Sequence, residues 1–195
     1  GYEEISLSSL SSSDYSSLEE LVNFLIDECR ERRVNISLPS LRIDAFSLDV
    51  MSKVQDIKKS SLTFAPEAGS QRLRDVINKG LTEEVILNGA QMAFEGGWNK
   101  VKLYFMMGLP TETYEDLDGI SDICKKVAYC WRENTPNRAR GVRITASASC
   151  FVPKPQTPFQ WDAQDTLEQF REKQAHMKVV MKTKNVTYNW HDSDT

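Results

Sequence analysis

Two segments that follow apolar runs carry residue types able to bind a polar ligand. In Phe64-Ala65-Pro66-Glu67-Ala68-Gly69-Ser70, a carboxylate comes directly after the apolar run and before a glycine turn. Such a carboxylate can accept hydrogen bonds from a diol such as a ribose. It can equally cap the next helix, whose N-terminus favours negative charge by about 0.3–1 kcal/mol. Lys79-Gly80, at the end of that helix, are also the residue types of an ordinary helix C-terminus. Spacing alone therefore leaves both roles open for both positions.

The second segment is Met107-Gly108-Leu109-Pro110-Thr111-Glu112-Thr113. Its glycine allows the main chain to approach a flat ligand closely, its proline stiffens the turn, and Thr113 can cap a following helix. An ordinary joint between a strand and a helix would use the same residues. The segment is thus a candidate ligand loop, with a purely structural alternative.

Strand-like and helix-like patterns alternate along the chain and must position these loops. Strand patterns cover 4–10, 34–43, 61–65, 100–107, 142–152 and 186–190, and helix patterns cover 16–29, 48–57, 70–78, 82–95, 113–131 and 165–182. We expect Thr82 and Asp165 to cap the helices over 82–95 and 165–182. Alternation of this kind predicts an α/β fold with a parallel sheet and right-handed crossovers. We expect an incomplete (β/α) TIM-type barrel of about five to six parallel strands with outer helices; a doubly wound sheet is the alternative. In both folds, ligands bind at the carboxyl ends of the strands.

The composition is that of an ordinary globular protein. The 195 residues are 40% hydrophobic and 27% charged, and no apolar run reaches the roughly 20 residues needed to span a bilayer. The net charge of −4, with both signs interspersed, does not indicate nucleic acid as a partner. Cys29, Cys124, Cys130 and Cys150 show no CxxC spacing, so we expect free thiols in a reducing, cytoplasmic location.

Three motifs, in order, resemble the barrels of the radical S-adenosylmethionine (SAM) superfamily, and the resemblance covers nearly the whole chain. Glu67 to Arg72 followed by Asn78-Lys79-Gly80 resembles the fourth strand and helix of methylthiotransferases and oxygen-independent coproporphyrinogen oxidase. Residues 104–113 resemble the fifth strand with its G-[LF]-P-x-E-T turn, and 150–159 resemble the sixth strand's aromatic-x-P-[KR]-P-x-T-P ending. Phe151-Val152-Pro153-Lys154-Pro155, with residues 188–192, is most similar to the subgroup whose full chains carry a cobalamin-binding-like region upstream.

The resemblance implies a chemistry and a set of roles. In the superfamily, a [4Fe–4S] cluster held by a CxxxCxxC motif after the first strand reduces SAM to methionine and a 5′-deoxyadenosyl radical. The resemblance implies that Glu67 contacts the SAM ribose. It also places Lys79 where relatives often have an arginine that pairs with the SAM carboxylate. A lysine keeps the positive charge but cannot form the two parallel hydrogen bonds that an arginine guanidinium forms. The resemblance also implies that Ser40 and Arg42 make polar contacts with SAM. The residues that would line its adenine are Gly108, Leu109, Phe151, Val152 and Pro153.

The chain departs from the superfamily pattern at its beginning. CxxxCxxC and a first strand are missing, and Ser11-Ser12-Ser13-Asp14 stand in place of the glycine-rich motif after the second strand. We therefore expect residues 1–195 to be one partial radical SAM barrel domain, truncated at both ends and inactive alone. The cluster would be bound by residues outside this fragment, and the resemblance to the cobalamin-associated subgroup implies cobalamin as a further cofactor of the parent.

Two further interpretations remain open at this point. One is a degenerate barrel that acts as a non-catalytic binding module. The other is a conventional barrel enzyme that binds a phosphorylated metabolite, for which Pro153-Lys154-Pro155 is a poor phosphate cradle because neither proline has an amide hydrogen. The identity of the substrate is not indicated by any of these residues.

Overall fold

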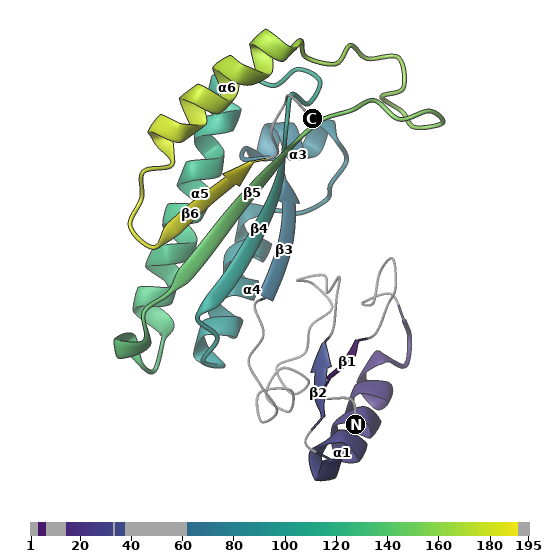
Figure 1. Cartoon of the computed structure of the whole chain (residues 1–195), viewed down its shortest axis with the longest axis vertical. Helices are drawn as coiled ribbons and strands as arrows, with labels where there is room; N and C mark the ends of the chain where they lie inside the picture. The colour runs from purple at the N-terminus through teal and green to yellow at the C-terminus, as the bar shows by residue number, and fades with distance from the viewer. Residues whose placement is uncertain (1–3, 7–14, 33, 38–61, 191–195) are drawn as a thin grey trace.

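The structure, a computed structural model, describes residues 4–6, 15–32, 34–37 and 62–190. Its strands form two parallel sheets. β1 (Glu4–Ser6) pairs with β2 (Asn35–Ser37). The second sheet has the order β3-β4-β5-β6, with β3 (Leu62–Glu67), β4 (Lys100–Met107), β5 (Arg143–Cys150) and β6 (Val186–Trp190). Each neighbouring pair in that sheet is parallel (Figure 1). The predicted α/β fold with parallel strands is confirmed.

Helices connect the strands, as the alternation predicts. They are α1 (Leu18–Arg32), α3 (Gln71–Val76), α4 (Glu83–Glu95), α5 (Tyr114–Asn134) and α6 (Leu167–Val180), with a short 3-10 helix, η3 (Arg138–Arg140), before β5. No helix in these described ranges combines the length and apolar character that a membrane span requires. The helix predicted over 48–57 lies outside the described residues.

Side-chain caps fix where the long helices begin. The hydroxyls of Thr82 and Thr113 accept hydrogen bonds from the first turns of α4 and α5. The prediction that Asp165 caps the last helix is wrong by one residue, because Thr166 forms a capping box with Gln169. The Asp165 carboxylate accepts a hydrogen bond from Lys173 instead, at 2.6 Å.

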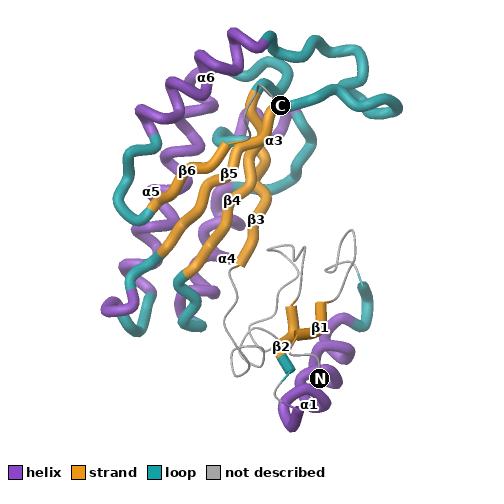
Figure 2. The backbone as a smooth tube through the Cα atoms, viewed as in Figure 1, coloured by secondary structure: helices purple, strands orange, loops and turns teal. Residues whose placement is uncertain are grey.

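The four-stranded sheet is covered by helices on one face. Alternate residues of β4 and β5 are buried there with apolar residues of α4, α5 and α6 in one core cluster; the strand members are Val101, Leu103, Phe105, Met107, Ile144, Ala146 and Ala148. The intervening residues of β4 and β5, such as Lys102, Tyr104 and Ser147, are exposed or half-buried. Figure 2 shows these helices on the same side of the sheet. A doubly wound sheet would carry helices on both faces, so the position of α4, α5 and α6 on one face, among the described residues, favours the incomplete barrel.

Parallel pairing gives the sheet two chemically distinct ends. We call the loops that follow β3, β4 and β5 (residues 67–70, 108–113 and 151–161) the carboxyl edge. We call the opposite end the amino edge. It consists of the segments that lead into β4, β5 and β6, together with the first residues of β4 and β5 (residues 96–102, 135–143 and 181–185). The predicted site residues Glu67, Gly108, Leu109 and 151–153 all belong to the carboxyl edge, and Lys79, after α3, contacts Glu67 there.

Candidate functional site

The carboxyl edge brings together residues that are more than 80 positions apart. The Phe151 N–H donates a hydrogen bond to the Met107 carbonyl at 2.8 Å, which joins the chain after β5 to the end of β4. Leu109 and Phe151 share a buried apolar cluster with Ala68 and Leu73. The loops after three neighbouring strands therefore meet at one place, with Glu67 at the end of β3.

Glu67 and Lys79 contact each other at this edge. Lys79 Nζ donates to Glu67 Oε1 at 3.1 Å, and the two side chains keep 25% (Glu67) and 32% (Lys79) of their surfaces exposed. A partly exposed pair contributes only about 0–1 kcal/mol to stability. The pair therefore presents one carboxylate and one ammonium, both open to solvent, at the predicted ligand edge.

The main chain is strained in each loop of this edge. Glu67 (φ 66°), Thr111 (φ 66°) and Gln156 (φ 62°) have positive φ; Glu67 ends β3, and Thr111 and Gln156 follow β4 and β5. The other described non-glycine residues with positive φ are Asn78 and Asn185, a residue type that tolerates this conformation. Strain of this kind costs about 1–3 kcal/mol per residue and clusters at ligand sites.

Position 108 requires a glycine because of its main-chain conformation and its close neighbours. Its φ is +82°, and a Cβ at this position would lie 2.6 Å from Phe170 Cε1 and 2.8 Å from Asp165 Oδ2. Its N–H donates to Glu112 Oε2 at 2.8 Å. The turn after β4 is therefore held from one side by Glu112 and from the other by α6 and the residues before it.

Glu112, Asp165 and Lys173 form a cluster, the Lys173 cluster, that links this turn to α6. Lys173 Nζ donates to Glu112 Oε2 at 2.8 Å and to Asp165 Oδ2 at 2.6 Å, and the Glu112 side chain is only 1% exposed. Burial raises the pKa of Glu112. Burial alone would lower the pKa of Lys173, but hydrogen bonds to Asp165 and Glu112 outweigh it and raise that pKa. No local pattern in the sequence distinguishes Lys173 from other helix lysines, so it could not be predicted as part of the site.

A second ionic cluster fixes the start of α3 to the start of α5. Asp116, with 3% of its side chain exposed, accepts hydrogen bonds from Ser70, Arg72 and Thr113. Burial would raise the pKa of Asp116, but these hydrogen bonds outweigh it and lower the pKa to about 2. Arg72 also donates to the Thr111 carbonyl at 2.8 Å. This cluster, also missed in the sequence, holds the loop after Glu67 against the turn after β4.

Arg74 supports the Glu67 loop from inside. It is 1% exposed, and its guanidinium donates to the carbonyls of Ala68 (2.9 Å) and Gly69 (3.2 Å). Burial lowers the pKa of Arg74. Gly69 itself packs against α5, where a Cβ would lie 2.2 Å from the Asp116 carbonyl oxygen. The conformation that presents Glu67 is thus fixed by buried contacts.

The remaining predicted residues differ in their surroundings. Ser40, Arg42 and residues 11–14 lie outside the described residues. The Phe151 ring is 8% exposed and packs at 6.2 Å, edge to face, against Phe159. Val152 is 52% exposed and Pro153 is half-buried. Of the three positions after β5, Val152 is therefore the one most open to a ligand, and Phe151 lies beneath it.

The described residues of this edge offer groups for an organic ligand. They are an apolar floor, a glycine main chain and a carboxylate beside an ammonium. In contrast, no group of three His, Cys, Asp or Glu side chains suited to a metal ion occurs within the described ranges. Cys124 is buried, and burial raises its pKa to about 12, which opposes the thiolate a cluster needs.

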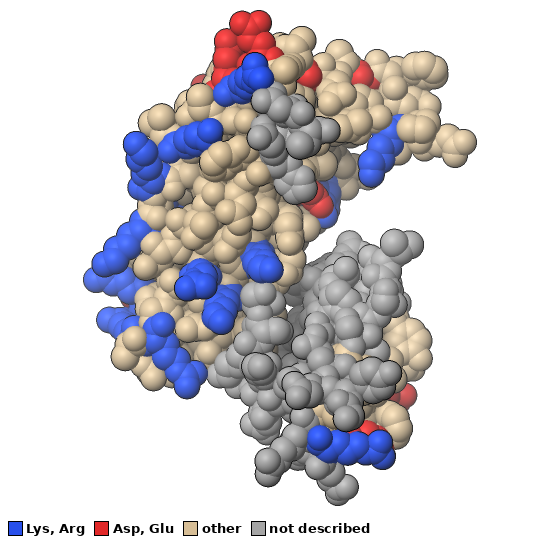
Figure 3. All heavy atoms as spheres, in the orientation of Figure 1, with Lys and Arg blue, Asp and Glu red and all other residues tan. Residues whose placement is uncertain are grey.

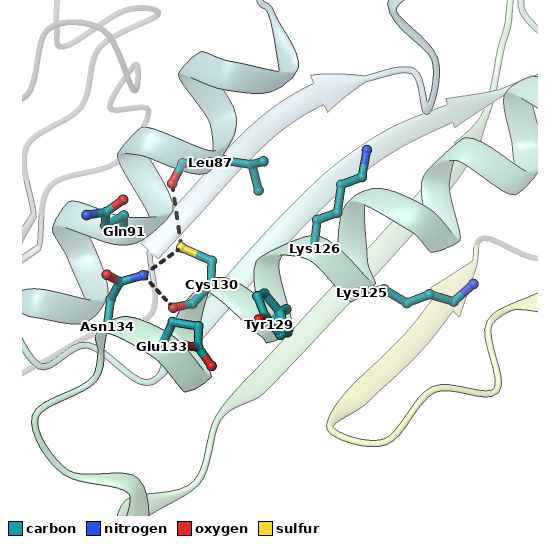
Figure 4. A pocket seen from close by; sticks show the side chains of 8 residues that line it. All are labelled: Leu87, Gln91, Lys125, Lys126, Tyr129, Cys130, Glu133 and Asn134. Atoms are coloured by element: carbon teal, nitrogen blue, oxygen red, sulfur yellow. Dashed lines mark hydrogen bonds between the residues drawn. The ribbon is translucent and has the colours of Figure 1, made fainter.

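A groove of about 470 Å³ lies elsewhere, between α4 and α5 (Figure 4). Its lining consists of Leu87, Gln91, Lys125, Lys126, Tyr129, Cys130, Glu133 and Asn134. None of the predicted site residues belongs to it. Burial raises the pKa of the Cys130 thiol, whose Sγ lies 3.8 Å from the Leu87 carbonyl oxygen. This groove is a feature of the helical layer and is separate from the carboxyl edge.

Comparison with known proteins gives the chain a family. Methylornithine synthase (PylB) matches the whole chain and 59% of its own length, with a TM-score of 0.54 at 12% identity, which supports the fold alone. An uncharacterized protein of Methanocaldococcus jannaschii, MJ0966, is 41% identical over 157 residues, which are 80% of this chain. The chain spans about a third (32%) of that relative's length. A family model described as the radical SAM superfamily matches residues 1–124. The chain therefore belongs to the radical SAM superfamily.

Proposed function

We propose that the carboxyl edge of the four-stranded sheet binds SAM, and that the full-length protein is a radical SAM enzyme. The observation that carries this proposal is the meeting of Glu67, the Gly108–Leu109 turn and the loop after Phe151 at one end of neighbouring parallel strands. Membership of the superfamily supports it, because SAM is the small molecule that these proteins generally bind.

Each residue of the edge has a role in the proposed site. Glu67 accepts hydrogen bonds from the ribose hydroxyls, and Lys79 pairs with the carboxylate of SAM. The Gly108–Leu109 main chain and the Val152–Pro153 segment flank the adenine, over the apolar floor that Leu109 and Phe151 form with Ala68 and Leu73. Ser40 and Arg42 complete the polar contacts.

The iron–sulfur cluster of the proposed enzyme is bound by residues outside this chain. The described residues provide no ligand set for it, and the sequence has no CxxxCxxC motif. Residues 1–195 then form a partial barrel domain that supplies orientation to SAM and substrate. The bound cluster supplies the electron for SAM cleavage. We expect no stoichiometric [4Fe–4S] cluster on this chain after anaerobic reconstitution; iron analysis that finds one would contradict this assignment.

A cobalamin-associated parent is the finer assignment. It rests on the Phe151-Val152-Pro153-Lys154-Pro155 segment and on the sequence around Trp190. The full-length protein, purified with added cobalamin, should then retain the corrinoid and its visible absorption bands. Release of all corrinoid on gel filtration would remove this assignment and leave the SAM site as it stands.

The decisive experiment is a calorimetric titration of the full-length protein with SAM. Glu67→Gln removes a charged acceptor, and hydrogen bonds to charged groups contribute about 1.5–3 kcal/mol. We therefore expect SAM affinity to fall about tenfold or more. Glu84→Gln, an equal change on the exposed face of α4, should leave the affinity unchanged. Unaltered affinity in Glu67→Gln would remove Glu67 from the site, and absence of SAM binding by the wild-type protein would favour the non-catalytic binding module.

A further inference from the structure

The amino edge of the four-stranded sheet gathers cationic side chains from three segments. The strands begin side by side there: the Arg143 N–H donates to the Asn99 carbonyl at 2.8 Å, and the Ile144 N–H donates to the Asn185 carbonyl at 2.9 Å. Lys100 and Arg143 face each other in register. The exposed cations of this edge are Lys100, Lys102, Arg138, Arg140, Arg143, Lys182 and Lys184.

Carboxylates are missing from the same segments. Residues 96–111, 135–161 and 173–190 contain no Asp or Glu. Within residues 62–190, none of the seven cations forms an ion pair with a carboxylate. In Figure 3, blue side chains gather over the lower left of the visible face, while the largest red group lies at the top, away from them. The edge is therefore positive although the whole chain has a net charge of −4.

Local negative charge does not neutralise this edge. The helices α4, α5 and α6 end next to it, and each helix C-terminus contributes only about half a negative charge. Glu95 and Glu133 stand on the last turns of α4 and α5, and Arg132 beside them adds a positive charge. Seven cations exceed these contributions, so a net positive field remains.

The chemistry of the edge favours phosphate over a protein surface. Protein interfaces are centred on buried aromatic and aliphatic anchors. None of the exposed large hydrophobic residues of the described chain lies within residues 96–102, 135–143 or 181–185; Tyr104 and Val179 flank these segments. Three of the seven cations are arginines, whose planar forks match phosphate oxygens. Contacts to a phosphodiester backbone need cations and no apolar anchor.

We propose that the amino edge binds the phosphodiester backbone of a nucleic acid, without reading its sequence. The edge lies at the opposite ends of the strands from the proposed SAM site, so this binding does not depend on SAM. Its salt dependence follows from counterion release, which for single strands gives a slope of log affinity against log salt of about −0.7 per neutralised phosphate.

The test is fluorescence anisotropy of a labelled 20-nucleotide single-stranded RNA with the full-length protein over a range of salt concentrations. The combined variant Lys102→Gln, Arg140→Gln and Arg143→Gln should weaken binding more than tenfold at low salt and flatten the salt slope by about 2, since three cations are lost. The matched control is Arg32→Gln, Lys125→Gln and Lys126→Gln, which removes the same charge from helix surfaces and should bind within about threefold of wild type. All six residues are exposed, and circular dichroism of both variants verifies their folding.

Three results would overturn the proposal. They are an absence of RNA binding by the wild-type protein, an equal loss in the two triple variants, and displacement of the RNA by polyglutamate of equal charge at equal concentration. The last result would identify the edge as a surface for acidic protein segments. SAM titration of the same variants keeps the two proposals apart, because the amino-edge variant should bind SAM as the wild type does.

Discussion

Asp116 shows how one buried side chain can hold two segments of the carboxyl edge together. It accepts hydrogen bonds from Ser70 and Arg72 at the start of α3 and from Thr113 at the start of α5. A folded-state pKa of about 2, below the ordinary 3.8, means that the folded protein favours the charged carboxylate. The ionised form therefore stabilises the fold.

The sign of this effect gives a pH prediction. The contribution of Asp116 is fully present above about pH 4, and it is lost as the pH falls from about 4 to about 2; the difference in pKa corresponds to about 2 kcal/mol. Asp116→Asn should lower the free energy of unfolding at neutral pH by about 2 kcal/mol and should remove this part of the acid dependence. Urea denaturation at several pH values measures both. Asp122→Asn, at an exposed carboxylate of α5, should retain the acid dependence of the wild type, and a similar loss in both variants would contradict the role of Asp116.

Single residues of the site could be predicted only where the sequence is locally unusual. Glu67, Gly108 and Leu109 stand directly after strands and belong to recognisable turns, and the structure brings them to one edge. Lys173 contacts Glu112 across 61 positions, and Arg72 contacts Asp116 across 44. Contacts between residues so far apart in the sequence form only when the crossovers bring the segments together, so no local sequence pattern predicts them.

At the scale of elements, the close approach of the loop after β3 to α5 depends on two glycines. Cβ atoms at Gly69 and Gly119 would lie within 3 Å of main-chain atoms of the other segment. This contact allows α3 and α5 to begin next to each other, where the Asp116 cluster forms.

Gly69→Ala should therefore separate the loop from α5. We expect a loss of about 1–3 kcal/mol in the free energy of unfolding, the usual cost of overpacking a tight contact, together with weaker SAM binding through displacement of Glu67. Gly141→Ala is a useful comparison, because Gly141 has φ +65° and no atom within 4 Å of an added Cβ. Its φ of 65° with ψ of 170° is a conformation found almost only at glycine, so Gly141→Ala should also cost about 1–3 kcal/mol but leave SAM binding unchanged. Wild-type SAM affinity in Gly69→Ala would show that this contact does not position Glu67.

The Lys173 cluster joins α6 to the turn after β4 and makes a second element-scale prediction. Lys173→Met leaves Glu112 buried without its cationic partner, and breaking a buried pair costs about 3–5 kcal/mol. The double variant Glu112→Gln with Lys173→Met should recover part of that loss, since the most deeply buried carboxylate of the cluster, Glu112, no longer carries an unpaired charge; only Asp165, which is 19% exposed, still lacks its partner. Chemical denaturation of Glu112→Gln, Lys173→Met and the double variant gives the double-mutant cycle that measures the interaction energy of the two side chains. Additive losses would show that Glu112 and Lys173 do not interact.

The elements themselves could be predicted well where the pattern is long and bounded by caps or turns. The strand predicted over 100–107 and the one over 186–190 match β4 and β6, and Thr82 caps α4 as expected. The start of α6 was placed one residue early, because Asp165 and Thr166 are both good capping residues and only the tertiary contact of Asp165 with Lys173 separates them.

At the scale of the whole molecule, the sheet presents different chemistry at its two ends. The carboxyl edge has strained loops, an apolar floor and one exposed ion pair, whereas the amino edge is cationic without carboxylates. Alternation along the sequence predicted the parallel sheet. It could not show that the described helices α4, α5 and α6 share one face, because a strand–helix–strand unit has the same sequence pattern in a barrel and in a doubly wound sheet. Likewise, a net charge of −4 hides the amino edge, which exists only when three strand starts lie side by side.

Hydrogen–deuterium exchange of the full-length protein, with and without SAM, can show whether SAM binds at the carboxyl edge. Peptides that cover 67–73, 107–113 and 150–159 should exchange more slowly with SAM, while peptides over 96–102 and 135–143 at the amino edge should exchange at the same rate. Protection confined to other regions, with unchanged exchange in all three carboxyl-edge loops, would contradict the account.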